Sequence, residues 1–182
     1  MIPYEHAMLT LWFSFGLVGL ARRFPRELGA TVGFVAMLLF FQLAAERAGK
    51  LLYKATSAMG IDASQDLVCW VFYTAVILAV VGIVYVGETL TFAGEWPPDR
   101  LSGAIIDATI GWVNGWLVIG TWWYFGNKLN YPQQALGMYT PPLSSFGQRL
   151  VAITPLAIIP EDYALWIIAG ALLLLLFLKF GR

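Results

Sequence analysis

The sequence predicts an all-α protein, a polytopic membrane helix bundle of about five transmembrane helices with an amphipathic interfacial segment. Apolar residues make up 59% of the chain and charged residues only 12%, whereas soluble domains contain roughly 45–50% and about 25%. Separate apolar runs approach the ~20 residues that a helix needs to cross a bilayer. Basic and acidic residues balance at 11 each, so no net charge favours nucleic acid as a partner.

The first two predicted spans form an antiparallel hairpin. The first covers about residues 2–20, and no basic residue precedes it, which argues against a signal peptide. The second covers about residues 28–45 and follows after a short turn. Gly29 and Gly33 lie one helical turn apart at its start, and this spacing lets another helix approach closely.

A basic turn joins these two spans and contains Arg22, Arg23 and Arg26. If the first helix dominates orientation, this cluster places the N-terminus outside the cell and the turn inside. The turn also suits docking of anionic lipid or of a soluble partner. A cluster that only sets the topology is the simpler interpretation.

Residues 46–66 are more polar than the runs on either side, and one helical face carries Arg47, Lys50 and Lys54. This pattern predicts an amphipathic helix at the level of the lipid headgroups or an extension of the second span. The third span covers about residues 67–92 and contains Cys69, the only cysteine. An intrachain disulfide is therefore excluded, and a buried, inert thiol is expected.

The fourth span, about residues 101–125, carries a small or polar residue at every fourth position. The members of this stripe are Gly103, Asp107, Gly111 and Gly115. Positions four apart lie on one face of a helix, so the stripe exposes a narrow strip of nearly bare backbone. In a membrane such a surface is typical of close helix–helix contact.

The remaining chain divides into two parts. Residues 126–160 contain several prolines and predict a loop over the bundle or an interfacial or re-entrant segment. Residues 161–182 predict an additional C-terminal transmembrane helix with a leucine block that faces lipid.

Asp107 is the sharpest candidate for chemistry, because it lies about 9 Å inside the start of the fourth span. Intramembrane carboxyls are costly and often functional. One hypothesis is a proton or cation site with Asn114 on the same helical face; the other is a carboxyl that is protonated or bonded to a neighbouring helix. Glu88, near the end of the third span, is a further polar candidate that could pair with Arg100.

No metal site or catalytic site is predicted. The sole histidine, His6, could ligate chlorophyll or haem near a helix start, but an interfacial polar role is the simpler interpretation. One His and one Cys cannot build a zinc site. Nucleophilic hydrolysis needs a base beside the nucleophile, and His6 is distant in sequence from Ser144 and Ser145. We therefore expect a protein that is not an enzyme.

Two segments resemble the colicin V production protein family. The first is YEHA (residues 4–7), an apolar helix, and LARRFPREL (residues 20–28), which is similar to the family's acidic N-terminal residue and basic R-G-F-x-R-E-like turn. The second is DRLSG (residues 99–103) with its four-residue small-residue steps, similar to the family's fourth helix. The resemblance covers most of residues 4–125 and implies a four-helix core there. It also implies a small multi-pass protein of the plasma (inner) membrane, linked to colicin export or envelope physiology and without established catalytic activity.

The chain departs from this family pattern at several positions. Arg23 stands where a glycine is usual, Pro25 enters the turn, and Asp107 occupies a glycine step. Ile110 and Asn114 flank the late glycines, where the family commonly has an arginine. The additional span after residue 160 also exceeds the usual four.

Three functions remain open from the sequence. The first is a scaffold of the colicin V production type, which acts by helix packing against other membrane subunits or a second copy. The second is an accessory subunit of a photosynthetic or respiratory complex. The third is a small ion or proton transporter or channel that uses Asp107, although no inverted repeat supports it.

Overall fold

The computed structural model describes residues 4–87, 92, 100–137 and 143–180, and all regular elements in these ranges are helices. The first half contains α1 (Tyr4–Arg22), α2 (Phe24–Phe40), the π-helical turn η1 (Phe41–Ala45), α3 (Glu46–Ala58) and α4 (Gln65–Val86). The second half contains α5 (Arg100–Gly115), the π-helical turn η2 (Trp116–Gly120), α6 (Thr121–Lys128), the 3₁₀ helix η3 (Pro132–Leu136), α7 (Ser145–Ala152), α8 (Pro155–Ile158) and α9 (Glu161–Phe180).

The all-α class predicted from the sequence is confirmed, and the apolar helices are compatible with a multi-pass membrane protein. Within the described residues, four helices are long and apolar enough to cross a membrane: Phe24–Ala58, Gln65–Val86, Leu101–Lys128 and Glu161–Phe180. The first predicted span forms α1, a helix of 19 residues that is not among these four.

The second predicted span and the polar segment after it belong to one rod. α2, η1 and α3 follow one another without a break, so the helix is continuous over 35 residues. α3 thus continues the helix of the second predicted span as far as Ala58, and its position at the level of the headgroups stays a prediction. The chain reverses after α3 with Gly60 at φ 76°, and the Ser64 hydroxyl then caps α4 by accepting a hydrogen bond from the Leu67 backbone N–H at 3.2 Å.

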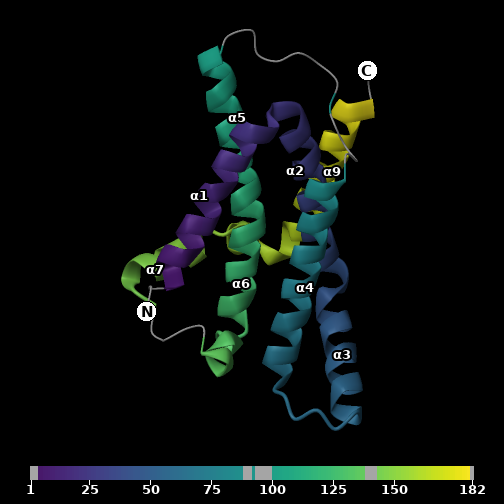
Figure 1. Cartoon of the computed structure of the whole chain (residues 1–182). Coiled ribbons are helices and arrows are strands. Elements are labelled where there is room, and N and C mark those ends of the chain that lie inside the picture. The colour runs from purple at the N-terminus through teal and green to yellow at the C-terminus, as the bar shows by residue number, and fades with distance from the viewer. Residues whose placement is uncertain (1–3, 88–91, 93–99, 138–142, 181–182) are drawn as a thin grey trace.

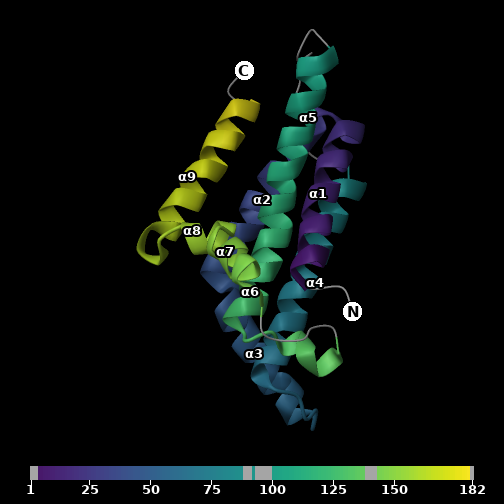
Figure 2. The same cartoon turned by 90° about the vertical axis from the view of Figure 1, so that its left-hand side faces the viewer.

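The long elements alternate in direction along the bundle (Figure 1). α1 lies antiparallel to α5, and α4 lies antiparallel to the α2–α3 rod. α9 packs against α2 on the side of the bundle away from α1 (Figure 2). α2 is the central element, since it contacts α1, α4, α5 and α9.

The segment between α6 and α9 packs against the bundle as the two short helices α7 and α8. Pro155 at the start of α8 lies against Gly120 of η2, where a Cβ on the glycine would come within 2.6 Å of the proline ring. The Trp116 indole N–H also donates to the Ile153 carbonyl at 2.8 Å. Both contacts join this segment to the π-helical turn, where the absence of a side chain at Gly120 makes room for the proline.

Candidate functional site

A group of polar side chains is buried between α1, α2, α4 and α5, and we call it the Glu27 cluster: Arg22, Glu27, Thr31, Tyr85 and Asn114. Glu27 is 0% exposed. Its Oε1 lies 2.9 Å from the Arg22 Nε, while its Oε2 accepts hydrogen bonds from Asn114 Nδ2 at 2.8 Å and from the Tyr85 hydroxyl at 3.2 Å. Four helices therefore meet around one carboxylate.

The outer members of the Glu27 cluster complete its hydrogen bonds. Asn114 is also 0% exposed, and its Nδ2 donates to the Glu27 backbone carbonyl at 3.0 Å. The Thr31 hydroxyl donates to Asn114 Oδ1 at 2.7 Å. On the other side, the Arg22 guanidinium donates to the Tyr85 backbone carbonyl at 2.9 Å and lies 4.6 Å from the centre of the Tyr85 ring. Since buried charges are tolerated only when paired and hydrogen-bonded, the cluster satisfies the requirement for a carboxylate in the interior.

The three arginines of the predicted basic turn have different environments. Arg22 points into the Glu27 cluster, whereas Arg23 and Arg26 are exposed. Arg23 separates α1 from α2 and adopts φ 69° and ψ 157°, a region populated almost entirely by glycine. Only two of the three arginines therefore remain accessible to a lipid headgroup or a soluble partner.

The side chain of Asp107, a residue of α5, contacts the beginning of α2. Its Oδ1 accepts a hydrogen bond of 2.5 Å from the Phe24 backbone N–H, which is one of the N–H groups that a helix start leaves without an intrahelical partner. The carboxylate thus acts as an N-cap supplied by a different helix. Asp107 and Asn114 share a face of α5, but their hydrogen bonds go to different groups of α2.

The small residues of the α5 stripe lie against α1. A Cβ added to Gly111 would come within 2.4 Å of the Phe15 carbonyl oxygen, and one added to Gly115 within 2.6 Å of the Trp12 carbonyl oxygen. On α1, a Cβ at Gly19 would lie 2.2 Å from the Asp107 carbonyl oxygen. The two backbones are in direct contact, so the stripe is occupied within this chain.

The other predicted packing glycines differ in their surroundings. Gly33 faces α4, where an added Cβ would lie 2.5 Å from a Val84 methyl carbon. Gly29 is buried in α2, and Gly103 is half-buried near the start of α5.

The remaining candidates do not join the Glu27 cluster. His6 is exposed near the start of α1, and Cys69 is a buried free thiol in α4. Glu88 lies outside the described residues, as does the side chain of Arg100, so their predicted pairing stays a prediction. Within the described ranges, no group of three or more His, Cys, Asp or Glu side chains could hold a metal ion.

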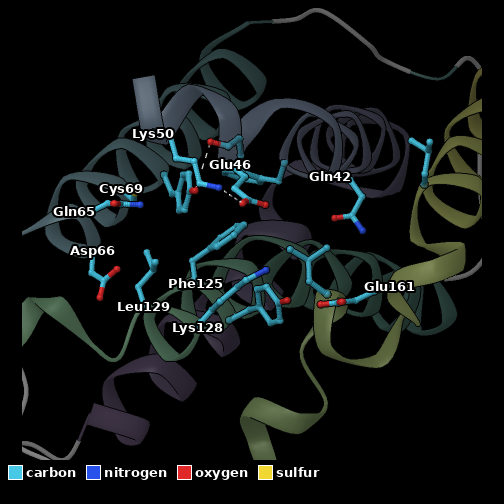
Figure 3. Close-up of a pocket in the computed structure, with 16 residues that line it drawn as sticks. Gln42, Glu46, Lys50, Gln65, Asp66, Cys69, Phe125, Lys128, Leu129 and Glu161 are labelled. Atoms are coloured by element: carbon cyan, nitrogen blue, oxygen red, sulfur yellow. Dashed lines mark hydrogen bonds and ion pairs between the residues drawn. The ribbon is translucent and has the colours of Figure 1, made fainter. Parts of the chain in front are cut away.

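A cavity of about 510 Å³ lies at the other end of the bundle, between the α2–α3 rod, α4, α6, α8 and α9 (Figure 3). We call it the charged cavity because five charged side chains line it: Glu46, Lys50, Asp66, Lys128 and Glu161. Glu46 and Lys50 form an ion pair of 2.6 Å with one another. No other ion pair joins these five among the described residues.

The floor of the charged cavity is aromatic. Tyr73, Phe41 and Phe125 form a triangle of rings. The Tyr73 ring centre lies 5.7 Å from that of Phe41 and 4.5 Å from that of Phe125, and the two phenylalanine rings are 4.8 Å apart. Phe41 belongs to η1, which contributes Gln42 and Ala45 to the lining as well. π-Helical turns of this kind occur frequently at functional sites.

Sequence reasoning missed both Glu27 and the charged cavity. Glu27 follows three arginines, and its sequence neighbourhood predicts a solvated turn. The signal that could have revealed it is Thr31, one turn further on the same face, because a polar residue inside an apolar helix needs a buried partner. The charged cavity forms where distant helix ends meet, and no local pattern marks it.

Comparison of the chain with known protein families, with curated proteins and with solved structures finds no match.

Proposed function

We propose that this chain is an integral multi-pass membrane protein that acts as a non-catalytic scaffold or accessory subunit, through lateral contacts of its helices with other membrane subunits. The observation that carries the proposal is that the Glu27 carboxylate finds its counter-charge and its hydrogen-bond donors within the chain. Its carboxylate is neutralised by Arg22 and receives further hydrogen bonds from Tyr85 and Asn114. A carboxylate held in this way stabilises one arrangement of helices, whereas an ion-transport site needs ligands that are open to its ion.

The surface offered to a partner is the outer face of α9 rather than the glycine stripe, which α1 already covers. Trp166, Leu173 and Phe177 lie seven and four positions apart, so they share one face of α9, and all three are exposed. α9 joins the rest of the bundle mainly through α2, so its outer face is open to a neighbouring transmembrane helix along its length.

We also propose that α1 crosses the membrane, which gives five spans. α1 packs antiparallel on α5 through Gly19 and Gly111, and α5 begins one of the four helices that are apolar enough to span. The exposed face of α1 carries the apolar side chains of Leu17 and Leu20. An apolar face of this kind suits lipid.

The resemblance to the colicin V production family, and with it a location in the plasma (inner) membrane, belongs to the same proposal. The backbone of Arg23 supports it. At φ 69° and ψ 157°, this position favours glycine, which is the residue usual for the family at this point of the turn. In this chain an arginine is accommodated there with its side chain exposed.

Purification in a mild detergent tests the scaffold function. We expect the tagged chain to retain at least one membrane protein at fixed stoichiometry, identified by mass spectrometry. The double variant Trp166→Ala/Phe177→Ala should release it without lowering the thermal unfolding midpoint. The matched control is Leu78→Ala/Ile83→Ala, which truncates two exposed side chains of α4 instead. Recovery of the chain alone, or equal retention by both double variants, would contradict the proposal.

A further inference from the structure

We infer that the charged cavity binds the headgroup of a zwitterionic amphiphile that carries a primary ammonium beside a phosphate, as in phosphatidylethanolamine. This inference goes beyond the proposed scaffold function and does not depend on it. It rests on the mixture of charges in the cavity, on its aromatic floor and on its position at helix ends.

The charges favour a ligand with a cationic group. Glu46 and Lys50 neutralise each other at 2.6 Å. The remaining lining charges are then the carboxylates of Asp66 and Glu161 and the ammonium of Lys128. Carboxylates in excess of cations select an ammonium group, while Lys128 provides a counter-charge for an adjacent phosphate. A purely anionic headgroup would meet net repulsion.

The aromatic floor also favours an ammonium. The Tyr73 and Phe125 rings line the charged cavity with centres 4.5 Å apart, and both residues are buried. The faces of such rings attract cations, and the attraction is strongest where water is excluded. Lys128 already lies 5.7 Å from the centre of the Tyr124 ring, so this end of the bundle holds one cation against an aromatic surface.

The position of the charged cavity favours an amphiphile over a water-soluble compound. Asp66 lies in the first turn of α4, Glu161 begins α9, and Lys128 ends α6, so the charges gather where three helices that are apolar enough to span begin or end. On one side the lining continues into Leu156 of α8 and Leu165 of α9. A polar headgroup would sit among the charges while an acyl chain follows these leucines into the bilayer. The volume of about 510 Å³ accommodates a headgroup and the first part of a chain.

Native mass spectrometry of the detergent-purified full chain tests the inference. The protein is presented with equimolar phosphatidylethanolamine and phosphatidylglycerol of identical acyl chains. We expect phosphatidylethanolamine to be retained preferentially. Glu161→Gln should reduce this preference by about tenfold, because it removes one charge-assisted hydrogen bond to the ammonium. Asp162→Asn is the matched control, since this neighbouring carboxylate does not line the cavity.

Two further variants and a competition complete the test. Phe125→Leu should weaken retention of phosphatidylethanolamine while the fold persists, as judged by circular dichroism. Lys128→Gln should weaken it also, and Lys54→Gln, which lies outside the cavity, should not. Soluble glycerophosphoethanolamine at the same concentration should not compete. Equal retention of both lipids, equal effects of Glu161→Gln and Asp162→Asn, or effective competition by the soluble headgroup would overturn the inference. Because these measurements use the isolated chain, they are independent of whether a partner subunit is found.

Discussion

The Asn114 amide of α5 donates to the Glu27 carboxylate of α2 at 2.8 Å, across 87 positions of sequence. The same nitrogen donates to the Glu27 backbone carbonyl at 3.0 Å, and both residues are fully buried. Sliding one helix along the other would leave these groups without partners in an interior that water does not reach. The pair therefore fixes the relative depth of α2 and α5, which hydrophobic packing alone would leave adjustable.

Replacement of Asn114 by leucine should destabilise the protein by about 2–3 kcal/mol, because a buried carboxylate loses one of its donors. Thr31→Val, which removes a hydroxyl that lies within hydrogen-bond distance of both Asn114 Oδ1 and the Glu27 backbone carbonyl, should cost about 1 kcal/mol. Unfolding in detergent micelles, followed by circular dichroism, measures both.

The control for these variants is Thr109→Val on the exposed face of α5, where the hydroxyl donates to the carbonyl one turn back. This change should alter the free energy of unfolding by less than about 0.5 kcal/mol. If Asn114→Leu lowered the free energy of unfolding no more than Thr109→Val does, the Glu27 cluster would not stabilise the bundle.

Alanine at Gly111 or Gly19 should separate α1 from α5. The new methyl groups would lie 2.4 Å from the Phe15 carbonyl oxygen and 2.2 Å from the Asp107 carbonyl oxygen. Backbone cannot yield to a methyl group as a flexible side chain does, so each change should cost about 1–3 kcal/mol. Near-ultraviolet circular dichroism reports the contact, since the rings of Trp12 and Trp112 stack across it with centres 5.2 Å apart in the unmodified chain.

Gly82→Ala and Gly170→Ala are the matched controls, because no atom of the described residues lies within 4 Å of a Cβ built at either position. Both should be neutral or stabilise their helices by up to about 1 kcal/mol. Equal effects at Gly111 and Gly82 would show that helix propensity, and not the contact with α1, determines the outcome.

The fold class follows from local sequence, since apolar runs of sufficient length leave few alternatives to membrane-spanning helices. The spacing of Gly103, Asp107, Gly111 and Gly115 likewise indicates a surface for close contact. Which helix occupies that surface could not be predicted. The opposing glycines of α1, Gly16 and Gly19, are only three positions apart in a helix dominated by bulky residues.

The chemistry of the two candidate sites could not be predicted in the same way. Glu27 follows a basic turn, and its true partners Tyr85 and Asn114 come from helices 58 and 87 positions later. The charged cavity is lined by residues from the ends of several helices. The sequence of each end by itself predicts an ordinary, solvated helix terminus. Asp107 was identified as a site from its depth, but its role as a cap depends on where α2 begins, which is a tertiary relationship.

Replacement of Arg23 by glycine should stabilise the protein by about 1 kcal/mol. A non-glycine residue in this backbone region costs about 1–3 kcal/mol, and the greater freedom of glycine in the unfolded chain offsets part of the gain. Arg23 is exposed, so little packing is lost. Arg26→Gly is the control: it lies in the first turn of α2, and there glycine should destabilise by about 0.5–1 kcal/mol. The two changes remove the same charge, so an opposite sign isolates the backbone effect; a loss of stability in both would exclude strain at Arg23.

The fifth span is tested by the location of the termini. If α1 crosses the membrane, the N-terminus and the loop at residues 59–64 lie on one side and the C-terminus on the other, as the opposite ends of α1 and α9 suggest (Figure 1). If α1 does not cross, the N-terminus lies on the side of the C-terminus. Fusions of a reporter that is active on only one side of the membrane, placed at each terminus and within residues 59–64, distinguish the two arrangements.

We expect equal reporter activity at the N-terminus and in the loop, and the opposite result at the C-terminus. The Gly19→Ala variant should leave this pattern unchanged, because insertion depends on the hydrophobicity of α1 and packing depends on its glycines.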